Sequence, residues 1–296
     1  MSEDESQDES PASRVSVVVL TCNRLGEVMR TIAGLLALPE KPPVIVVDNG
    51  SVDGTAHALR ERFPAVRAIE SPRNVGASAR NLGVAAVRTP YVAFCDDDTC
   101  WEPHALARAA ALLDAHPRIA VLCARILVGP EGREDPASAG MARSPLASDG
   151  LPGRAILGFM AGASVMRVDA FMAVGGYAPQ LFIGAEEALV ALDLAARGWQ
   201  MVYCPAIVTR HFPSPKRDRA GRRRLLLRNA LWVAWLRLPL RAAWRETVKV
   251  WREAARQGIA LGVASAALRG LPWVLRRRQV IPPPVRAMYR LVNSAD

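Results

Sequence analysis

The stretch YVAFCDDDT, residues 91–99, is the most informative part of the sequence. Its first four residues are apolar and typical of a buried β-strand, which runs almost directly into Asp96, Asp97 and Asp98. Consecutive carboxylates after a buried strand repel one another, so the pattern favours a cation among them. Such hard oxygen ligands suit Mg²⁺ or Mn²⁺, which take further ligands from water and phosphate. The alternative is a solvated acidic turn or a helix N-terminus.

Strands and helices alternate along the chain before this stretch. Apolar runs predict strands at residues 15–20, 44–47 and 66–69. Helical patterns follow these runs, at residues 28–36, from residue 55 onward, and at residues 77–87. This alternation indicates an α/β fold with a mostly parallel sheet that helices cover on both faces.

Polar clusters lie at the ends of three predicted strands, at residues 21–24, 48–54 and 96–98. Parallel sheets bind ligands at the carboxyl ends of their strands, so we expect these clusters to converge. Asp48 is suited to accept hydrogen bonds from a nucleobase or a ribose, although a well-formed turn alone would also explain it. Arg80 is expected to face a phosphate or the acidic cluster, with an ordinary surface arginine as the alternative.

The motifs, taken in order, resemble those of family 2 glycosyltransferases, inverting enzymes with the GT-A fold, with a rhamnosyltransferase-like branch as one candidate. The ordered set covers residues 14–212, and its order is more specific than any single motif. The matching segments are VSVVVLTCNR at 15–24, VIVVDNGSVDGT at 44–55, NVGASARNLG at 74–83, YVAFCDDDT at 91–99, FIGAEEALVALDLAARGW at 182–199 and VTRHF at 208–212.

The resemblance implies roles for residues on the donor side of the site. The residues implied for nucleotide-sugar binding are Thr21, Asn23, Arg24, Asp48, Asp53, Arg80, Asp96 and Asp97. Asp98 is implied as the principal metal ligand, while Asp96 would lie near the ribose and assist the metal. His211 would reach the metal or the diphosphate, and a structural histidine at a strand end is the alternative.

On the acceptor side, the resemblance implies that Glu187 is the general base that deprotonates the acceptor hydroxyl, with Glu186 as the adjacent candidate. The chain departs from many family members at Cys22, where an aromatic residue is common. It departs again after the paired glutamates, where Leu189 and Val190 replace the usual Asp-Leu.

The function implied is a metal-dependent, inverting glycosyltransferase that uses Mn²⁺ or Mg²⁺. Its donor would be a UDP-, dTDP- or GDP-sugar, and its acceptor a glycan, a lipid-linked saccharide or a small molecule. A nucleotidyltransferase is the first alternative, and a non-catalytic nucleic-acid-binding protein is the second. The second leaves the acidic clusters unexplained, so nucleic acid is not the expected partner.

Composition divides the chain into four predicted parts. Residues 1–13 form an acidic tail expected to be disordered, and residues 14–212 form the GT-A domain. Residues 213–224 are predicted to be a flexible basic loop, and residues 225–296 a helical C-terminal segment. The five cysteines lack disulfide or metal-site spacing and indicate a reducing, cytoplasmic location.

The C-terminal segment is strongly basic. Although the net charge of the whole chain is +10, residues 210–290 alone carry 20 Lys and Arg against three acids. Five tryptophans, at positions 232, 235, 244, 251 and 273, lie among these arginines. Interleaved Trp and Arg on amphipathic helices suit peripheral contact with the inner face of a membrane, and helix packing is the alternative. The most apolar stretch, residues 258–275, contains Arg269 and Pro272 and is not expected to span a bilayer.

Overall fold

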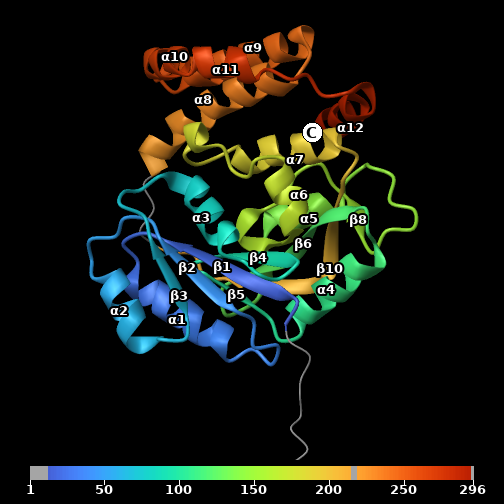
Figure 1. Ribbon diagram of the computed structural model, residues 1–296. Coiled ribbons are helices and arrows are strands. Elements are labelled where there is room, and N and C mark those ends of the chain that lie inside the picture. Colours follow the sequence, from blue (N-terminus) through green and yellow to red (C-terminus); the bar gives the residue numbers. More distant parts are fainter. Residues whose placement is uncertain (1–12, 215–218, 295–296) are drawn as a thin grey trace, which may run out of the picture.

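The computed structural model describes residues 13–214 and 219–294. One ten-stranded sheet lies between layers of helices, and the last five helices, α8–α12, form a separate layer at the top of the molecule in Figure 1. Most of the predicted acidic tail, residues 1–12, and residues 215–218 of the predicted basic loop lie outside the described residues.

The first half of the sheet has the predicted α/β pattern. The parallel strands are β1 (Val15–Thr21), β2 (Val44–Asp48), β3 (Arg67–Glu70) and β4 (Tyr91–Asp96). The helices that connect them are α1 (Leu25–Leu36), α2 (Thr55–Arg62) and α3 (Arg80–Ala85), the last preceded by the 3₁₀ turn η1 (Gly76–Ala79). In register, Thr21 pairs with Asp48 and Leu20 with Asp96, so the three polar clusters meet at one edge of the sheet.

The second half of the sheet is mixed. The strands are β5 (Thr99–Trp101), β6 (Ile119–Val128), β7 (Arg133–Glu134), β8 (Arg154–Ala155), β9 (Ser164–Arg167) and β10 (Gln200–His211). The helices and turns are α4 (Ala105–Ala115), α5 (Pro136–Ala142), η2 (Ala161–Ala163), α6 (Val168–Ala173), η3 (Pro179–Leu181) and α7 (Glu186–Ala196). The strand order is β3-β2-β1-β4-β9-β6-β10-β5, and β9 runs antiparallel to both of its neighbours. Because β10 is parallel to β6, it ends at the edge of the sheet that carries the acidic triplet, and His211 is its last residue.

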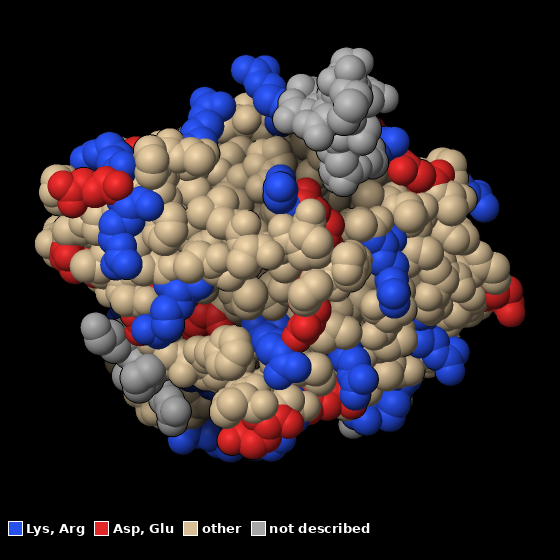
Figure 2. Space-filling view, turned by 90° about the horizontal axis from the view of Figure 1, so that it is seen from below, with Lys and Arg blue, Asp and Glu red and all other residues tan. Residues whose placement is uncertain are grey.

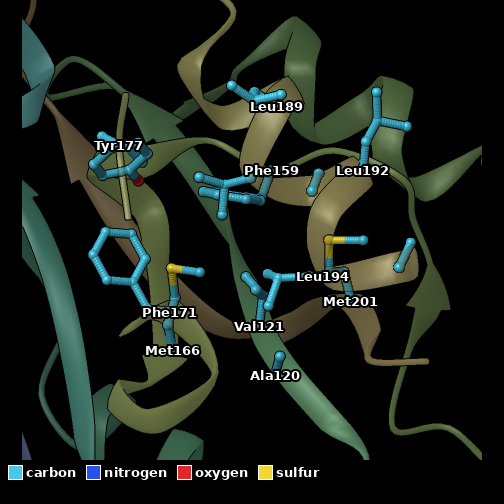
Figure 3. Close-up of a cluster of buried hydrophobic side chains, with 14 of the residues drawn as sticks. Ala120, Val121, Phe159, Met166, Phe171, Tyr177, Leu189, Leu192, Leu194 and Met201 are labelled. Atoms are coloured by element: carbon cyan, nitrogen blue, oxygen red, sulfur yellow. The ribbon is translucent and has the colours of Figure 1, made fainter. Parts of the chain in front are cut away.

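Alternation of buried side chains explains why the sheet is covered on both faces. Along β1, Val17 and Val19 belong to one hydrophobic cluster and Val18 belongs to the other. The cluster containing Val18 extends into α7 and the C-terminal helices, and Figure 3 shows Leu192 and Leu194 of α7 in this cluster together with Met201 of the sheet. The C-terminal helices therefore share a core with the sheet.

The C-terminal segment is helical as predicted, in α8 (Arg219–Arg237), α9 (Leu240–Arg256), α10 (Ala260–Arg269), α11 (Leu271–Arg277) and α12 (Pro283–Ser294). Helix α8 begins at Arg219, within the stretch that sequence assigned to a basic loop. Arginine is a good helix former, and Arg223 bonds Glu253 of α9 at 2.8 Å, so this basic stretch is stable as a helix.

The tryptophans of this segment mostly pack between helices. Trp232 is 7% exposed, its Nε1 donates to the Ala267 carbonyl at 3.0 Å, and its ring packs edge-on against Trp273. Trp235 donates to the Thr247 hydroxyl at 2.9 Å. Only Trp244 of the five is largely exposed, at 62%. Within residues 13–214 and 219–294, no helix is both long and apolar enough to cross a bilayer.

Candidate active site

A cavity of about 460 Å³ lies at the carboxyl ends of the strands. It collects most of the residues implied by the sequence. Of these, the cavity is lined by Thr21, Arg24, Arg80, Asp96, Asp97, Asp98, Glu186, Glu187 and His211. Cys22, Asn49, Asn74, Phe182 and Arg222 also line it.

Asp97 points into the protein and anchors the acidic turn. Its carboxylate accepts hydrogen bonds from Thr21 Oγ1 at 2.9 Å and Arg24 Nη1 at 2.7 Å. Its carbonyl oxygen accepts a further bond from Thr31 Oγ1 at 2.9 Å. Burial raises the pKa of Asp97 to about 6, although Arg24 works in the opposite direction. Asp97 therefore holds the turn in place between its two neighbours.

Asp98 faces the end of β10. Its Oδ1 lies 3.6 Å from His211 Nε2, and its Oδ2 accepts a bond from the Ser214 amide at 3.2 Å. Burial alone would raise its pKa, but the hydrogen bond and charge of His211 lower it below the usual value. An ionised carboxylate and a neighbouring imidazole together form a suitable pair of ligands for a divalent cation.

Asp96 and Arg80 form an ion pair across the cavity wall. The Arg80 side chain is 8% exposed and that of Asp96 is 41% exposed, so the carboxylate reaches the cavity. A Cβ built on Gly162 would lie 2.6 Å from Asp96 Oδ2, so turn η2 can pass this close only with glycine there. Asp96 is thus fixed from both sides.

Glu186 and Glu187 begin helix α7 and line the same cavity. Glu186 is only 4% exposed, and burial together with the charge of Glu187 raises its pKa to about 7. Burial also raises the pKa of Glu187, and the charge of Asp96 acts in the same direction. With a pKa of about 7, Glu186 is therefore partly protonated near neutral pH.

Arg80 is a buried cation that acts on both Asp96 and the two glutamates. It pairs with Asp96, and its charge acts on both glutamates and on the buried Tyr177. In the described part of the chain, Arg80 Nε, Tyr177 Oη and Glu186 Oε2 are buried without a hydrogen-bond partner. Such atoms are rare in folded proteins, and two of these residues, Arg80 and Glu186, line the cavity.

The turn before α7 is tightly held. Phe182, Gly184 and Ala185 all have positive φ, at 63°, 89° and 64°. On one side, the Ala77 amide donates to the Phe182 carbonyl at 2.6 Å, and a Cβ on Gly76 would lie 1.9 Å from that oxygen. Neighbouring elements therefore determine a strained backbone that aims the two glutamates.

On the other side of this turn, α8 supplies a fully buried asparagine. Asn229 Nδ2 lies within bonding distance of the carbonyls of Leu181, Ile183 and Gly184, at 2.8, 3.0 and 2.6 Å. Sequence analysis missed Asn229, because it lies in a basic helical stretch outside every motif. No local pattern marks it.

Three of the residues implied for nucleotide binding lie outside the cavity. Asn23 Oδ1 accepts from the Val52 amide at 2.8 Å, and Asp53 Oδ2 accepts from the Leu25 amide at 3.1 Å. Asp48 is buried, and its Oδ1 accepts from the Ser51 amide at 3.0 Å. The bonds of Asn23 and Asp53 tie the loop after β1 to the loop after β2, and that of Asp48 stabilises the loop after β2 itself.

The neighbouring amides Asn49 and Asn74 reach the cavity instead. Asn49 Nδ2 donates to Asn74 Oδ1 at 3.0 Å, and Asn74 Nδ2 lies 3.4 Å from Cys22 Sγ. Sequence analysis named Asp48 and passed over Asn49, although both lie in the same strand-end cluster.

Few side chains in the cavity are placed to bind a metal ion. Across the residues that the structure describes, no group of three or more His, Cys, Asp or Glu side chains is placed to hold a metal ion. Asp98 and His211 nevertheless offer one carboxylate and one imidazole beside the cavity. This pair fits a cation that takes its remaining ligands from phosphate and water.

Comparison with known proteins agrees with this geometry. The model of glycosyl transferase family 2 matches residues 16–175, just over half of the chain. The N-acetylglucosaminyl-diphospho-decaprenol L-rhamnosyltransferase of Mycobacterium tuberculosis is 27% identical over 233 residues, which cover 66% of this chain and 75% of that protein.

Solved structures show the same fold. The mannosyltransferase PcManGT from Pyrobaculum calidifontis, in complex with GDP-Man and Mn²⁺, matches with a TM-score of 0.58 and 20% identity, over 95% of this chain and 85% of that one. GalNAc-T7 with UDP, GalNAc and Mn²⁺ matches with a TM-score of 0.60 and 15% identity, over 78% of this chain and 49% of that one. Strand order, cavity and family match agree: the chain belongs to glycosyl transferase family 2 and is a glycosyltransferase of the GT-A fold.

Proposed function

We propose that this enzyme transfers a sugar from a nucleoside diphosphate to an acceptor hydroxyl, with inversion and with the help of Mn²⁺ or Mg²⁺. One observation carries the proposal: a single cavity is lined both by the Asp98–His211 pair and by Glu186 and Glu187. The first pair suits a leaving diphosphate with its metal, and the second suits an incoming hydroxyl.

On the donor side, Asp98 and His211 would hold the cation, which neutralises the diphosphate as it leaves. Thr21, Arg24 and the two amides Asn49 and Asn74 line the part of the cavity that would take the nucleotide. Asp96 would lie toward the ribose and the metal, held there by Arg80. Asn23, Asp48 and Asp53 would act by fixing the loops around the nucleotide, and any direct contact of Asp48 with the base stays a prediction.

On the acceptor side, Glu187 would accept the proton of the attacking hydroxyl. Its raised pKa makes it a stronger base than an exposed glutamate, and the positive charge of Arg80 keeps it available in ionised form. Glu186 Oε2, buried without a protein partner among the described residues, would bind a sugar hydroxyl or hold a proton.

We infer that the acceptor is lipid-linked. The M. tuberculosis relative is described as acting on N-acetylglucosaminyl-diphospho-decaprenol, and the strongly basic C-terminal segment suits an anionic substrate at a membrane. The donor would be a dTDP-, UDP- or GDP-sugar, with the relative favouring a rhamnosyl donor. All five cysteines are free thiols, which suits the cytoplasmic side of that membrane.

The test is to incubate the purified enzyme with Mn²⁺ and a panel of UDP-, dTDP- and GDP-sugars. Nucleoside diphosphate release and thermal shift are measured with and without metal. The expected result is stabilisation by one nucleoside diphosphate only when metal is present. Absence of stabilisation by every nucleoside diphosphate with Mn²⁺ or Mg²⁺ would overturn the proposal.

A further inference from the structure

Two short helices at the far end of the molecule expose leucines. Leu261 and Leu268 of α10 are 87% and 66% exposed, and Leu271 and Leu275 of α11 are 44% and 61% exposed. Spacings of seven and four residues place each pair on one face of its helix. We call these four residues the leucine surface. Helices α10 and α11 lie at the end of the molecule away from the sheet (Figure 1).

Arginines border the leucine surface without compensating acids. Arg269, Arg276 and Arg277 are exposed on the same two helices. The sequence contains no Asp or Glu at all from residue 257 to residue 294. The face seen from below in Figure 2, by contrast, carries Lys and Arg interspersed with Asp and Glu. The leucine surface is therefore apolar and cationic together.

This combination selects one kind of partner. A second copy of the chain would bring these arginines against each other with no acid to pair with, which is unfavourable. A nucleic acid would use the arginines, but it would leave the leucines exposed to water. An anionic lipid bilayer accepts both, because the leucines enter its interface while the arginines meet its headgroups.

We propose that the leucine surface docks the enzyme on an anionic membrane. This deepens the proposed function, because a lipid-linked acceptor is presented at such a surface. The tryptophans on which the sequence prediction rested are mostly occupied in packing the helices, so the exposed leucines take the membrane-facing role.

The leucine surface is linked to the active site through α8. A Cβ built on Gly262 of α10 would lie 3.2 Å from Arg224 Cδ of α8. Two residues earlier, Arg222 lines the active-site cavity. Helix α8 therefore contacts α10 with one residue and lines the active-site cavity with another.

The test uses the full chain and flotation with vesicles of phosphatidylcholine, with or without phosphatidylglycerol. The wild-type protein is expected to float with the anionic vesicles only. Combining Leu261→Gln, Leu268→Gln and Leu275→Gln should weaken binding on the order of a hundredfold, from the lost burial of three leucines. The matched control combines Leu36→Gln and Leu82→Gln, which are 40% and 44% exposed on other helices.

A second variant tests the charge. Combining Arg269→Gln, Arg276→Gln and Arg277→Gln should also lower binding to anionic vesicles on the order of a hundredfold at low salt. Equal flotation of the wild-type and triple-leucine proteins would overturn the proposal. So would a dimer, seen by light scattering, that the triple-leucine variant abolishes, since the surface would then join two copies.

Failure of docking and failure of the proposed function are distinguishable. Flotation needs no sugar nucleotide, and nucleoside diphosphate binding needs no vesicle. A triple-leucine variant that does not float but still shows the metal-dependent thermal shift is the result expected if both proposals are correct. A wild-type protein that floats but binds no nucleoside diphosphate would support the docking proposal and overturn the proposed function.

Discussion

Arg80 is a single buried cation among several carboxylates. It pairs with Asp96, and its positive charge acts to lower the pKa of Glu186 and of Glu187, so it offsets the repulsion among these carboxylates. Removing one partner of a buried charge network leaves the others uncompensated, which costs more than the pair contributes when intact.

We therefore predict that Arg80→Met lowers the free energy of unfolding by about 3–5 kcal/mol at neutral pH. Urea unfolding followed by circular dichroism measures this change. Arg62→Met, on the exposed face of α2, is the matched control and should stay within about 0.5 kcal/mol of the wild type. A loss for Arg80→Met no larger than that of the control would show that the carboxylates do not depend on this arginine.

For catalysis, Glu187→Gln should reduce transfer by a factor of about 10²–10⁴, because a general base typically contributes that much. Donor affinity, measured by thermal shift with nucleoside diphosphate and Mn²⁺, should not change. The comparison variant is Glu186→Gln, which should retain more activity. Loss of donor binding in Glu187→Gln would mean that the role of base is misassigned.

Stability should also depend on pH through Glu186. Its pKa is raised from 4.5 to about 7, so between these values the folded protein binds more protons than the unfolded chain. Stability therefore falls as pH rises through this window, by up to about 3 kcal/mol from this group. Glu186→Gln removes the effect, so its stability relative to the wild type should be greater at pH ~8 than at pH ~5. The exposed Glu61→Gln is the control, and equal pH profiles for Glu186→Gln and wild type would contradict the burial effect.

The residues of the candidate site were predictable where chemistry and position coincide. Asp98 and Glu187 were proposed because carboxylates follow a buried strand or begin a helix within a motif, and both line the cavity, while their roles stay predictions. Asn23 and Asp48 were assigned to nucleotide binding; in the structure Asn23 accepts an amide of the neighbouring loop and Asp48 an amide of its own loop. A strand-end side chain can turn toward a ligand or toward the next loop, and one sequence does not distinguish these directions.

At the scale of elements, the turn at residues 181–185 depends on partners that are distant in the sequence. Its carbonyls accept hydrogen bonds from the Ala77 amide on one side and from Asn229 on the other. The local sequence alone would not hold Ala185 at a positive φ, because left-handed backbone is unfavourable for alanine. The direction of α7, and with it the position of Glu187, is therefore determined by these contacts with distant parts of the chain.

Asn229→Ala should therefore impair catalysis more than donor binding. Buried carbonyls left without a donor cost about 1–3 kcal/mol in stability, and misplacement of the base should lower kcat by about tenfold to a hundredfold. The KM for the donor should change little, since Asn229 is not among the cavity-lining residues. Asn293→Ala, exposed on α12, is the control. A rise in donor KM with unchanged kcat would contradict this positioning role.

The elements themselves were predictable where short apolar runs mark them. The four strands from 15 to 96 follow such runs, and the structure confirms each of them, although β3 is less buried than the other three. The antiparallel β9 between β4 and β6 was not predicted, because its four residues carry no distinctive period. The early start of α8 was missed because a run of arginines resembles a loop in composition.

For the whole molecule, one hydrophobic cluster joins the sheet, α7 and the C-terminal helices. We predict that these parts unfold together. Five of the seven tryptophans lie in α8–α11, so fluorescence reports mainly on the C-terminal helices, whereas circular dichroism reports on the whole chain. The two signals should give the same midpoint in guanidinium, and an earlier fluorescence midpoint would show that the C-terminal helices unfold separately.

The family match also decides between the functions that the sequence left open. Membership of glycosyl transferase family 2 excludes the nucleotidyltransferase and the non-catalytic nucleic-acid-binding alternatives. The basic segment, which suggested the second alternative, forms helices that pack on the enzyme core.

The contact of Asn229 with the turn before α7 has a consequence for biosynthesis. As the chain leaves the ribosome from its N-terminus, the strands that would bind the donor emerge first, and the asparagine that fixes the catalytic turn emerges much later. Because these helices share one core with the sheet, a nascent or C-terminally clipped chain would lack both the anchor of this turn and part of that core. Under the proposed function, such a chain would not transfer the sugar. Synthesis itself would then delay turnover until the helices that approach the membrane are present.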